Sequence, residues 1–189
     1  LTGFAHLFEH LMFAGTRHIP RGQADRILDT AGVSDSNGST DFDRTNYFFT
    51  LPSNQLELGL WIKSDMLGYM IDQVDAVALA YQQDVVRNER PQSVENRPYG
   101  IVEETLYANL FPEGHPYRPM VIGTHADIQN AKLADVKHFA KTFYRPNNAT
   151  LVLVGDFEPK ATKKLLEKYF GALKAGDAVP PVVVPQAKL

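Results

Sequence analysis

The chain has 189 residues, of which 44% are hydrophobic and 11% aromatic, so it is long and apolar enough to bury the core of one domain. Its formal net charge of -3 and its isoelectric point near 6.1 give no basic surface field, which excludes the electrostatic signature of a nucleic-acid binder. The sequence has no cysteine, so any metal must be held by imidazole and carboxylate groups. No apolar run is long enough to span a bilayer.

Hydrophobic spacing divides the chain into helical and extended segments. Several segments repeat apolar residues at helical spacing and stop at glycine or proline. Three shorter segments are rich in β-branched and aromatic residues, which favour strands. The expected helices cover residues 3–14, 22–31, 54–71, 75–90, 98–110, 132–144 and 158–170. The expected strands cover residues 37–41, 44–51 and 149–154, the last of them buried.

This order of elements predicts an α+β domain with a mixed, mainly antiparallel sheet and helices packed largely on one face. The domain is expected to cover residues 1–175, with its amino-terminal strands missing. Leu1 is not an initiator methionine, so the gene product is expected to start upstream. Residues 176–189 are rich in proline and valine and are expected to form an extended linker toward a second half-domain. The absence of thiols favours a periplasmic or secreted location if the source is bacterial.

The first helix carries the strongest chemical signal. His6 and His10 are four residues apart, which on an α-helix sets their side chains about 40° apart, so both imidazoles can reach one ion. Glu9 lies on the same face and can act as a general base without taking a ligand position. This HxxEH pattern is the inverted zinc-peptidase motif. The alternative is a core helix with hydrogen-bonded histidines, but burying three such groups without a metal is costly.

A catalytic zinc site needs a third protein ligand and an open position for water. Glu89 is the preferred ligand, because it continues a row of apolar residues that starts at Val77 and includes Tyr81 at four-residue spacing. This row is expected to be buried, so the acid at its end requires a cation. The alternative is a solvated carboxylate paired with Arg87 or Arg90. The rival donors are Glu95, Glu103 and Glu104.

These residues resemble the pitrilysin and insulysin family of metallopeptidases, which also includes the mitochondrial processing peptidase. The resemblance runs from GFAHLFEHLMFAGT through SNGSTDFDRTNYFF, DVVRNER, ENRPYG, GHPY and VIGT to RPNNATLVLVGDF, so it covers nearly the whole chain. It implies a half-clamshell domain in which His6, His10 and Glu89 hold one zinc ion and Glu9 activates water. The implied activity is zinc-dependent hydrolysis of peptides or short unfolded polypeptides.

The resemblance also implies that a substrate peptide adds to an edge strand after the motif helix. Asn37, Gly38, Ser39 and Thr40 match that strand, and many relatives have alanine in place of Gly38. From the residues alone, this segment could equally be a plain hairpin loop.

Gln82 departs from the family pattern, since many members have a glutamate seven residues before the metal glutamate. A glutamine can hydrogen-bond a ligand but adds no negative charge, so we expect activity to survive with altered metal affinity. Family enzymes also close a second half over the substrate. Such a half, in the same chain or in a partner subunit, is expected here too, so we expect residues 1–189 alone to bind zinc but to cleave peptides poorly.

Two other functions are compatible with this fold class. A catalytically weak or inactive partner subunit usually has a broken HxxEH motif, which is intact here. A structural zinc domain has no use for a base such as Glu9. His115 could be a fourth ligand or a substrate contact, but a lone loop histidine more often packs against its neighbours. The aromatic residues 47–49 are expected in the core.

Overall fold

The computed structural model describes residues 2–186, so the last three residues of the predicted linker lie outside the described residues. Short 3₁₀ turns at Ser53–Gln55, Met70–Gln73 and Pro146–Asn148 and a π-helical turn at Pro91–Glu95 join the longer elements. The strands are β1 (Asp35–Thr40) and β2 (Thr45–Thr50). The helices are α1 (Phe4–Met12), α2 (Ala24–Thr30), α3 (Leu56–Tyr69), α4 (Ala76–Arg90), α5 (Val102–Leu110), α6 (His125–Asn130), α7 (Leu133–Phe143) and α8 (Pro159–Phe170).

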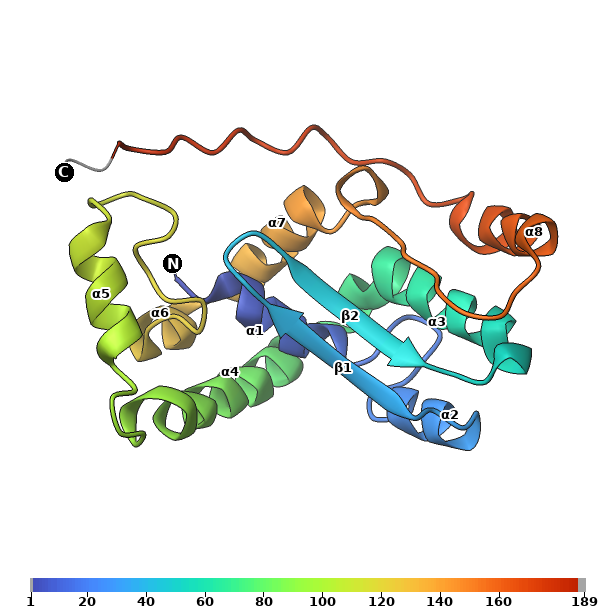
Figure 1. Cartoon of the computed structure of the whole chain (residues 1–189), viewed down its shortest axis with the longest axis horizontal. Helices are drawn as coiled ribbons and strands as arrows, with labels where there is room; N and C mark the ends of the chain where they lie inside the picture. Colours follow the sequence, from blue (N-terminus) through green and yellow to red (C-terminus); the bar gives the residue numbers. More distant parts are fainter. Residues whose placement is uncertain (1, 187–189) are drawn as a thin grey trace.

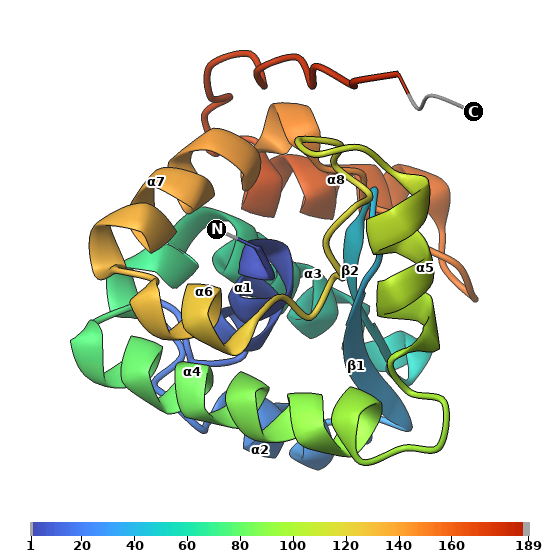
Figure 2. The same ribbon diagram turned by 90° about the vertical axis from the view of Figure 1, so that its left-hand side faces the viewer.

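The two strands form an antiparallel hairpin in front of most of the helices (Figure 1). Its register pairs Gly38 with Tyr47 and Thr40 with Thr45. Figure 2 shows the hairpin nearly edge-on, with α1, α3, α4 and α7 on one side of it. The predicted α+β class is confirmed, with a sheet of two antiparallel strands in the described part of the chain. None of the described helices is long and apolar enough to cross a bilayer.

A main core forms around α1, because the apolar residues of this helix leave only a narrow polar stripe. Phe8 is fully buried, and its ring lies 4.1 Å from that of Tyr144 and 5.3 Å from that of Phe139, centroid to centroid. Burying one such ring contributes about 2–3 kcal/mol. The buried residues of the main core are Leu7, Phe8, Leu11, Met12, Met70, Val74, Leu79, Val86, Ile128, Ala131, Val136 and Ala140.

A second core lies between α2, α3 and β2. Its fully buried members are Ile19, Leu28 and Ile62, and Phe49 of β2 packs against them. Tyr47, two residues earlier on the same face of the strand, packs against the main core, whereas Phe48 is 41% exposed. The expectation that residues 47–49 are core therefore holds for Tyr47 and Phe49 and is wrong for Phe48, because side chains alternate across a strand.

Local features fix the starts of α1 and α4. Gly3 begins α1 with φ of 75°, and a Cβ at this position would lie 2.7 Å from the carbonyl oxygen of Ile122 and 2.8 Å from Cα of Gly123. Only glycine permits this close approach. Asp75 caps α4 by accepting a hydrogen bond of 2.7 Å from the amide of Ala78.

The prediction of a buried strand at residues 149–154 is wrong. The apolar run predicts a buried strand, but it pairs with neither β1 nor β2, and the side chains of Val152 and Val154 are 75% and 89% exposed. An apolar run becomes a buried strand only where a neighbouring strand and a covering layer meet it, and the described residues supply neither. Figure 1 shows the segment passing as an extended connection to α8.

Two helices also differ from their predictions. α5 begins at Val102 rather than at residue 98, because the backbone turns at Tyr99, whose φ is 60°. α6 has no counterpart among the predicted helices, because a helix of six residues is too short to display a hydrophobic period. Its start is marked only by Thr124, which accepts a hydrogen bond of 3.1 Å from the amide of Asp127.

Candidate metal centre

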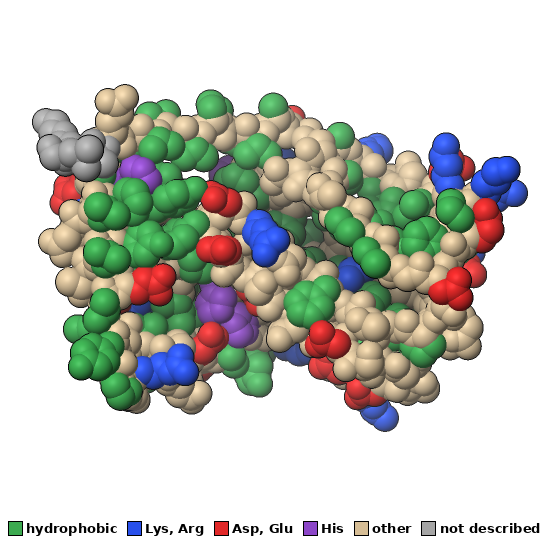
Figure 3. Space-filling model, viewed as in Figure 1, with side chains coloured by type: hydrophobic (Ala, Val, Ile, Leu, Met, Phe, Trp, Pro, Cys, Tyr) green, Lys and Arg blue, Asp and Glu red, His purple; other side chains and the backbone are tan. Residues whose placement is uncertain are grey.

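α1 and α4 bring three of the predicted site residues together. One ligand atom from each of His6, His10 and Glu89 lies within 4.8 Å of the others. The two Nε2 atoms are 3.4 Å apart, and Glu89 Oε2 is 3.3 Å from His10 Nε2 and 3.7 Å from His6 Nε2. Figure 3 shows histidine and acidic side chains reaching the surface together on this face, left of centre.

The arrangement fits a zinc ion. Two atoms bound tetrahedrally at about 2.0–2.1 Å from one zinc ion stand roughly 3.3–3.4 Å apart. The observed separations of 3.4, 3.3 and 3.7 Å agree with this within a few tenths of an ångström. Two imidazoles and one carboxylate are also the donor set of a common class of catalytic zinc sites. The role of the three residues as ligands stays a prediction.

The protonation states favoured at this site are those that a metal requires. Burial lowers the pKa of His6, and the nearby His10 lowers it further, although Glu89 opposes the shift. The hydrogen bond from His10 lowers the pKa of Glu89 against the opposing effect of burial. A neutral imidazole and an ionised carboxylate are the forms that bind a divalent cation. In addition, His6 Nδ1 is buried and has no hydrogen-bond partner among the described residues.

Glu89 lies near the histidines, but it does not continue a buried row of α4 as its spacing predicts. Val77 and Tyr81 are 67% and 65% exposed, so the predicted buried row is wrong. Each step of four residues turns an α-helix about 40° past a full turn, so the row winds from the solvent face at Val77 toward α1 at Glu89. The fully buried residues of α4 are Ala78, Leu79 and Val86.

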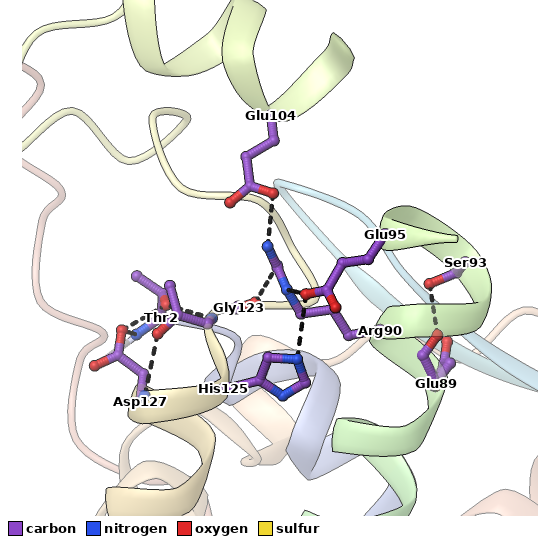
Figure 4. Close-up of polar contacts among 10 residues, drawn as sticks. Thr2, Glu89, Arg90, Ser93, Glu95, Glu104, Gly123, His125 and Asp127 are labelled. Atoms are coloured by element: carbon purple, nitrogen blue, oxygen red, sulfur yellow. Dashed lines mark hydrogen bonds and ion pairs between the residues drawn. The ribbon is translucent and has the colours of Figure 1, made fainter. Parts of the chain in front are cut away.

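Arg90 forms ion pairs with Glu95 and Glu104, two of the alternative candidates for the third metal ligand. Its Nε donates to Glu95 Oε1 at 3.0 Å, and its Nη2 donates to Glu104 Oε2 at 2.7 Å. Its Nη1 donates to the carbonyl oxygen of Gly123 at 2.6 Å, and Figure 4 shows the guanidinium between these groups. Glu103, the remaining rival, is exposed. The alternative in which Glu89 pairs with Arg87 or Arg90 is wrong, because Arg90 pairs with Glu95 and Glu104 and Arg87 pairs with Asp84.

Glu9 is buried, and it packs against β1. Thr40 Oγ1 donates a hydrogen bond to Glu9 Oε2. A Cβ at Gly38 would lie 2.8 Å from Glu9 Oε1, so the side chain of Glu9 lies directly against this residue. Residues 37–40 pair with residues 45–48 of β2, so they are strand and not a plain hairpin loop. The edge of β1 away from β2 is open in the described part of the chain.

The roles expected for Gln82 and His115 differ in how far the structure supports them. Gln82 makes no hydrogen bond with His6, His10 or Glu89 in the described residues, so its tuning role stays a prediction. His115 lies in the 111–123 loop and not at the cluster. Its ring stacks on Phe111 with centroids 4.3 Å apart, and its Nδ1 accepts a hydrogen bond of 3.1 Å from the amide of Tyr117, which is the expected packing role.

Comparison with known proteins gives matches over the whole chain. A family model described as Insulinase (Peptidase family M16) matches residues 1–122, and one described as Peptidase M16 inactive domain matches residues 130–189. The chain is 33% identical to the zinc protease PqqE of Helicobacter pylori, over 99% of this chain and 42% of that protein. It is 27% identical to the mitochondrial-processing peptidase subunit beta of Caenorhabditis elegans, over 93% of this chain and 37% of that protein.

Solved structures agree. A protease from Helicobacter pylori superposes with a TM-score of 0.88 at 31% identity, over 99% of this chain and 44% of that chain. The first half of the periplasmic protease PqqL from Escherichia coli superposes with a TM-score of 0.83 at 22% identity, over 97% of this chain and 40% of that chain, and shows likeness of fold alone. The chain spans less than half the length of these relatives. Because the insulinase model matches most of its length, the chain belongs to the M16 insulinase family of peptidases.

Proposed function

We propose that this chain is the zinc-binding, catalytic part of a metalloendopeptidase that hydrolyses peptides or short unfolded polypeptides. The observation that carries the proposal is the convergence of His6, His10 and Glu89, whose ligand atoms lie within 4.8 Å of one another. Glu9 projects from the same helix but is not part of this cluster, so a base stands beside the ligands without replacing one. Similarity to zinc proteases supports the same function.

A zinc ion held by His6, His10 and Glu89 would supply Lewis-acid chemistry, lowering the pKa of water and polarising the scissile carbonyl. The chain's own contribution to proton transfer is Glu9. Its carboxylate takes a proton from the attacking water and then delivers that proton to the leaving amine. Because Glu9 is only 8% exposed, its carboxylate is largely screened from bulk solvent.

The open edge of β1 supports an extended substrate. Asn37, Gly38, Ser39 and Thr40 lie on this strand, and Gly38 and Thr40 contact the proposed base. A peptide that adds a strand to this edge gains affinity through backbone hydrogen bonds, which any unfolded sequence can make. Its backbone would then run past Glu9, where a peptide bond must lie to be cleaved.

Exchange of Glu9 for glutamine tests the proposal. Glu9→Gln should lower the rate of hydrolysis by roughly a hundredfold or more while zinc content stays unchanged, because it removes the base and no ligand. His6→Ala should lose zinc and hydrolysis together. Zinc is measured by elemental analysis, and cleavage of a fluorogenic unfolded peptide is measured with the chain in excess, since we expect slow turnover by residues 1–189 alone. Cleavage by Glu9→Gln at the parental rate would contradict the proposal.

The alternative function is that of a catalytically weak or inactive partner subunit. The match of residues 130–189 to an inactive-domain model is the observation that favours it. All four motif residues lie in residues 1–122, which match the insulinase model, so we prefer the active enzyme. A parental chain that binds zinc but cleaves no faster than Glu9→Gln would favour the alternative.

A further inference from the structure

The β1 strand holds the carboxylate of Glu9 by a direct hydrogen bond. Thr40 Oγ1 donates to Glu9 Oε2, and the same hydroxyl lies 3.2 Å from Thr45 Oγ1 on β2. Gly38 packs against the other side of the carboxylate, where a Cβ would lie 2.8 Å from Oε1, 3.0 Å from Cγ and 3.2 Å from Cδ. Glu9 is therefore enclosed between its own helix and the carboxyl-terminal half of β1.

The hydrogen bond from Thr40 restricts the rotation of the Glu9 carboxylate. Among the described residues, the Glu9 carboxylate forms no salt bridge, and Thr40 is its only hydrogen-bond partner. The terminal torsion of a glutamate side chain is broad, so the carboxylate rotates readily unless a donor holds it. A hydroxyl that donates to an ionised carboxylate makes a short and strong bond, which engages Oε2 and leaves Oε1 without a protein donor.

We propose that Thr40 is a positioning residue, whose hydroxyl holds the Glu9 carboxylate in the one orientation in which Glu9 acts as the base. The inference rests on the proposed function of Glu9 as the base. It also gives β1 two tasks, because the strand that holds the base is the strand whose open edge would receive the substrate. Addition of a peptide to this edge would therefore align the peptide with a base that is already oriented.

The contact itself is tested without zinc or activity, by denaturant unfolding of the metal-free chain. Thr40→Val removes the hydroxyl at nearly constant volume. It should raise the equilibrium constant for unfolding roughly tenfold, because a buried carboxylate loses its donor. In a Glu9→Ala background the same exchange should have less than about a threefold effect. Thr40→Ser should behave like the parent. Equal effects in the two backgrounds would overturn the proposed contact, and Thr40→Ala replaces Thr40→Val if the latter does not fold.

The positioning role is tested in the zinc-loaded chain. Thr40→Val should reduce kcat roughly tenfold with KM changed less than about twofold, because misorientation of the base affects the transition state and not substrate binding. Zinc content should be unchanged, and Thr40→Ser should restore most of kcat. A rise in KM without a fall in kcat, or an equal loss in the serine and valine variants, would overturn the role. Parental activity in Glu9→Gln would instead overturn the proposed function, and the unfolding experiment would still report on the contact.

Discussion

The main core contains more buried residues than the second core, and the candidate metal centre lies against the main core. The main core joins α1, α4, α6 and α7, and the helix that carries His6, Glu9 and His10 is its centre. The second core has three fully buried residues behind the far half of the hairpin, and a lysine of α3 lies beside them. The difference teaches that the helices that carry the candidate ligands pack on the larger core, which suits a site whose side chains must be held in place.

The largest expected effect is on stability and comes from a substitution in the main core. Phe8→Ala should lower the free energy of unfolding by about 3–5 kcal/mol, because Phe8 is fully buried and stacked against two other rings. The control is Phe48→Ala, since Phe48 is 41% exposed and should cost less than about 1 kcal/mol. Urea unfolding of the metal-free chain measures both. Equal losses would contradict the contrast between a deep core and an exposed strand face.

The next largest effect is expected from Arg90, which anchors the end of α4 near the candidate ligand Glu89. Arg90→Ala should weaken zinc affinity roughly tenfold, because Arg90 fixes the end of α4, where Glu89 lies, to Gly123. The control is Arg87→Ala, whose side chain is 38% exposed and pairs with Asp84 at 3.7 Å. That variant should bind zinc like the parent. Affinity is measured by competition with a chromophoric chelator, and an equal loss in both variants would show that the contacts of Arg90 do not position Glu89.

The sequence predicted those parts of the site that depend on local geometry. His6, Glu9 and His10 share one helical turn, so their relative placement follows from the period of an α-helix. Glu89 lies in the cluster with the two histidines, but the premise of a buried row is wrong, and its role as a ligand stays a prediction. Whether a helical residue faces another helix depends on the packing angle between them, which spacing along one helix does not determine.

Long-range contacts account for most of what the sequence could not predict. The bond from Thr40 to Glu9 joins a strand to a helix across 31 positions, and neither residue type signals it. Residues 149–154 show the same limit in the opposite sense, because their composition predicts burial and the described fold leaves Val152 and Val154 in solvent. Hydrophobic composition gives the tendency of a segment to be buried, whereas burial itself requires a partner in space.

The smallest expected effect concerns Lys63 of α3, beside the second core. Its Nζ lies 4.2 Å from the centre of the Phe49 ring, and burial lowers its pKa to about 8. An unfolded chain keeps the ordinary lysine pKa of 10.5, so the folded state binds fewer protons between these two values. Below pH 8 the folded protein therefore bears the full cost of burying a charge, and this cost is relieved as the pH rises toward 10.5.

Lys63→Met should accordingly raise the free energy of unfolding at pH 7 by about 1 kcal/mol, after allowance for partial exposure and for the lost contact with Phe49. The gain should shrink as the pH approaches 10, because the parental lysine is then neutral in the folded state. Lys164→Met on the exposed face of α8 is the control and should change little at either pH. A gain that is constant with pH would mean that the second core accommodates the charge of Lys63 without cost, and the two cores would then differ in size but not in tolerance of charge.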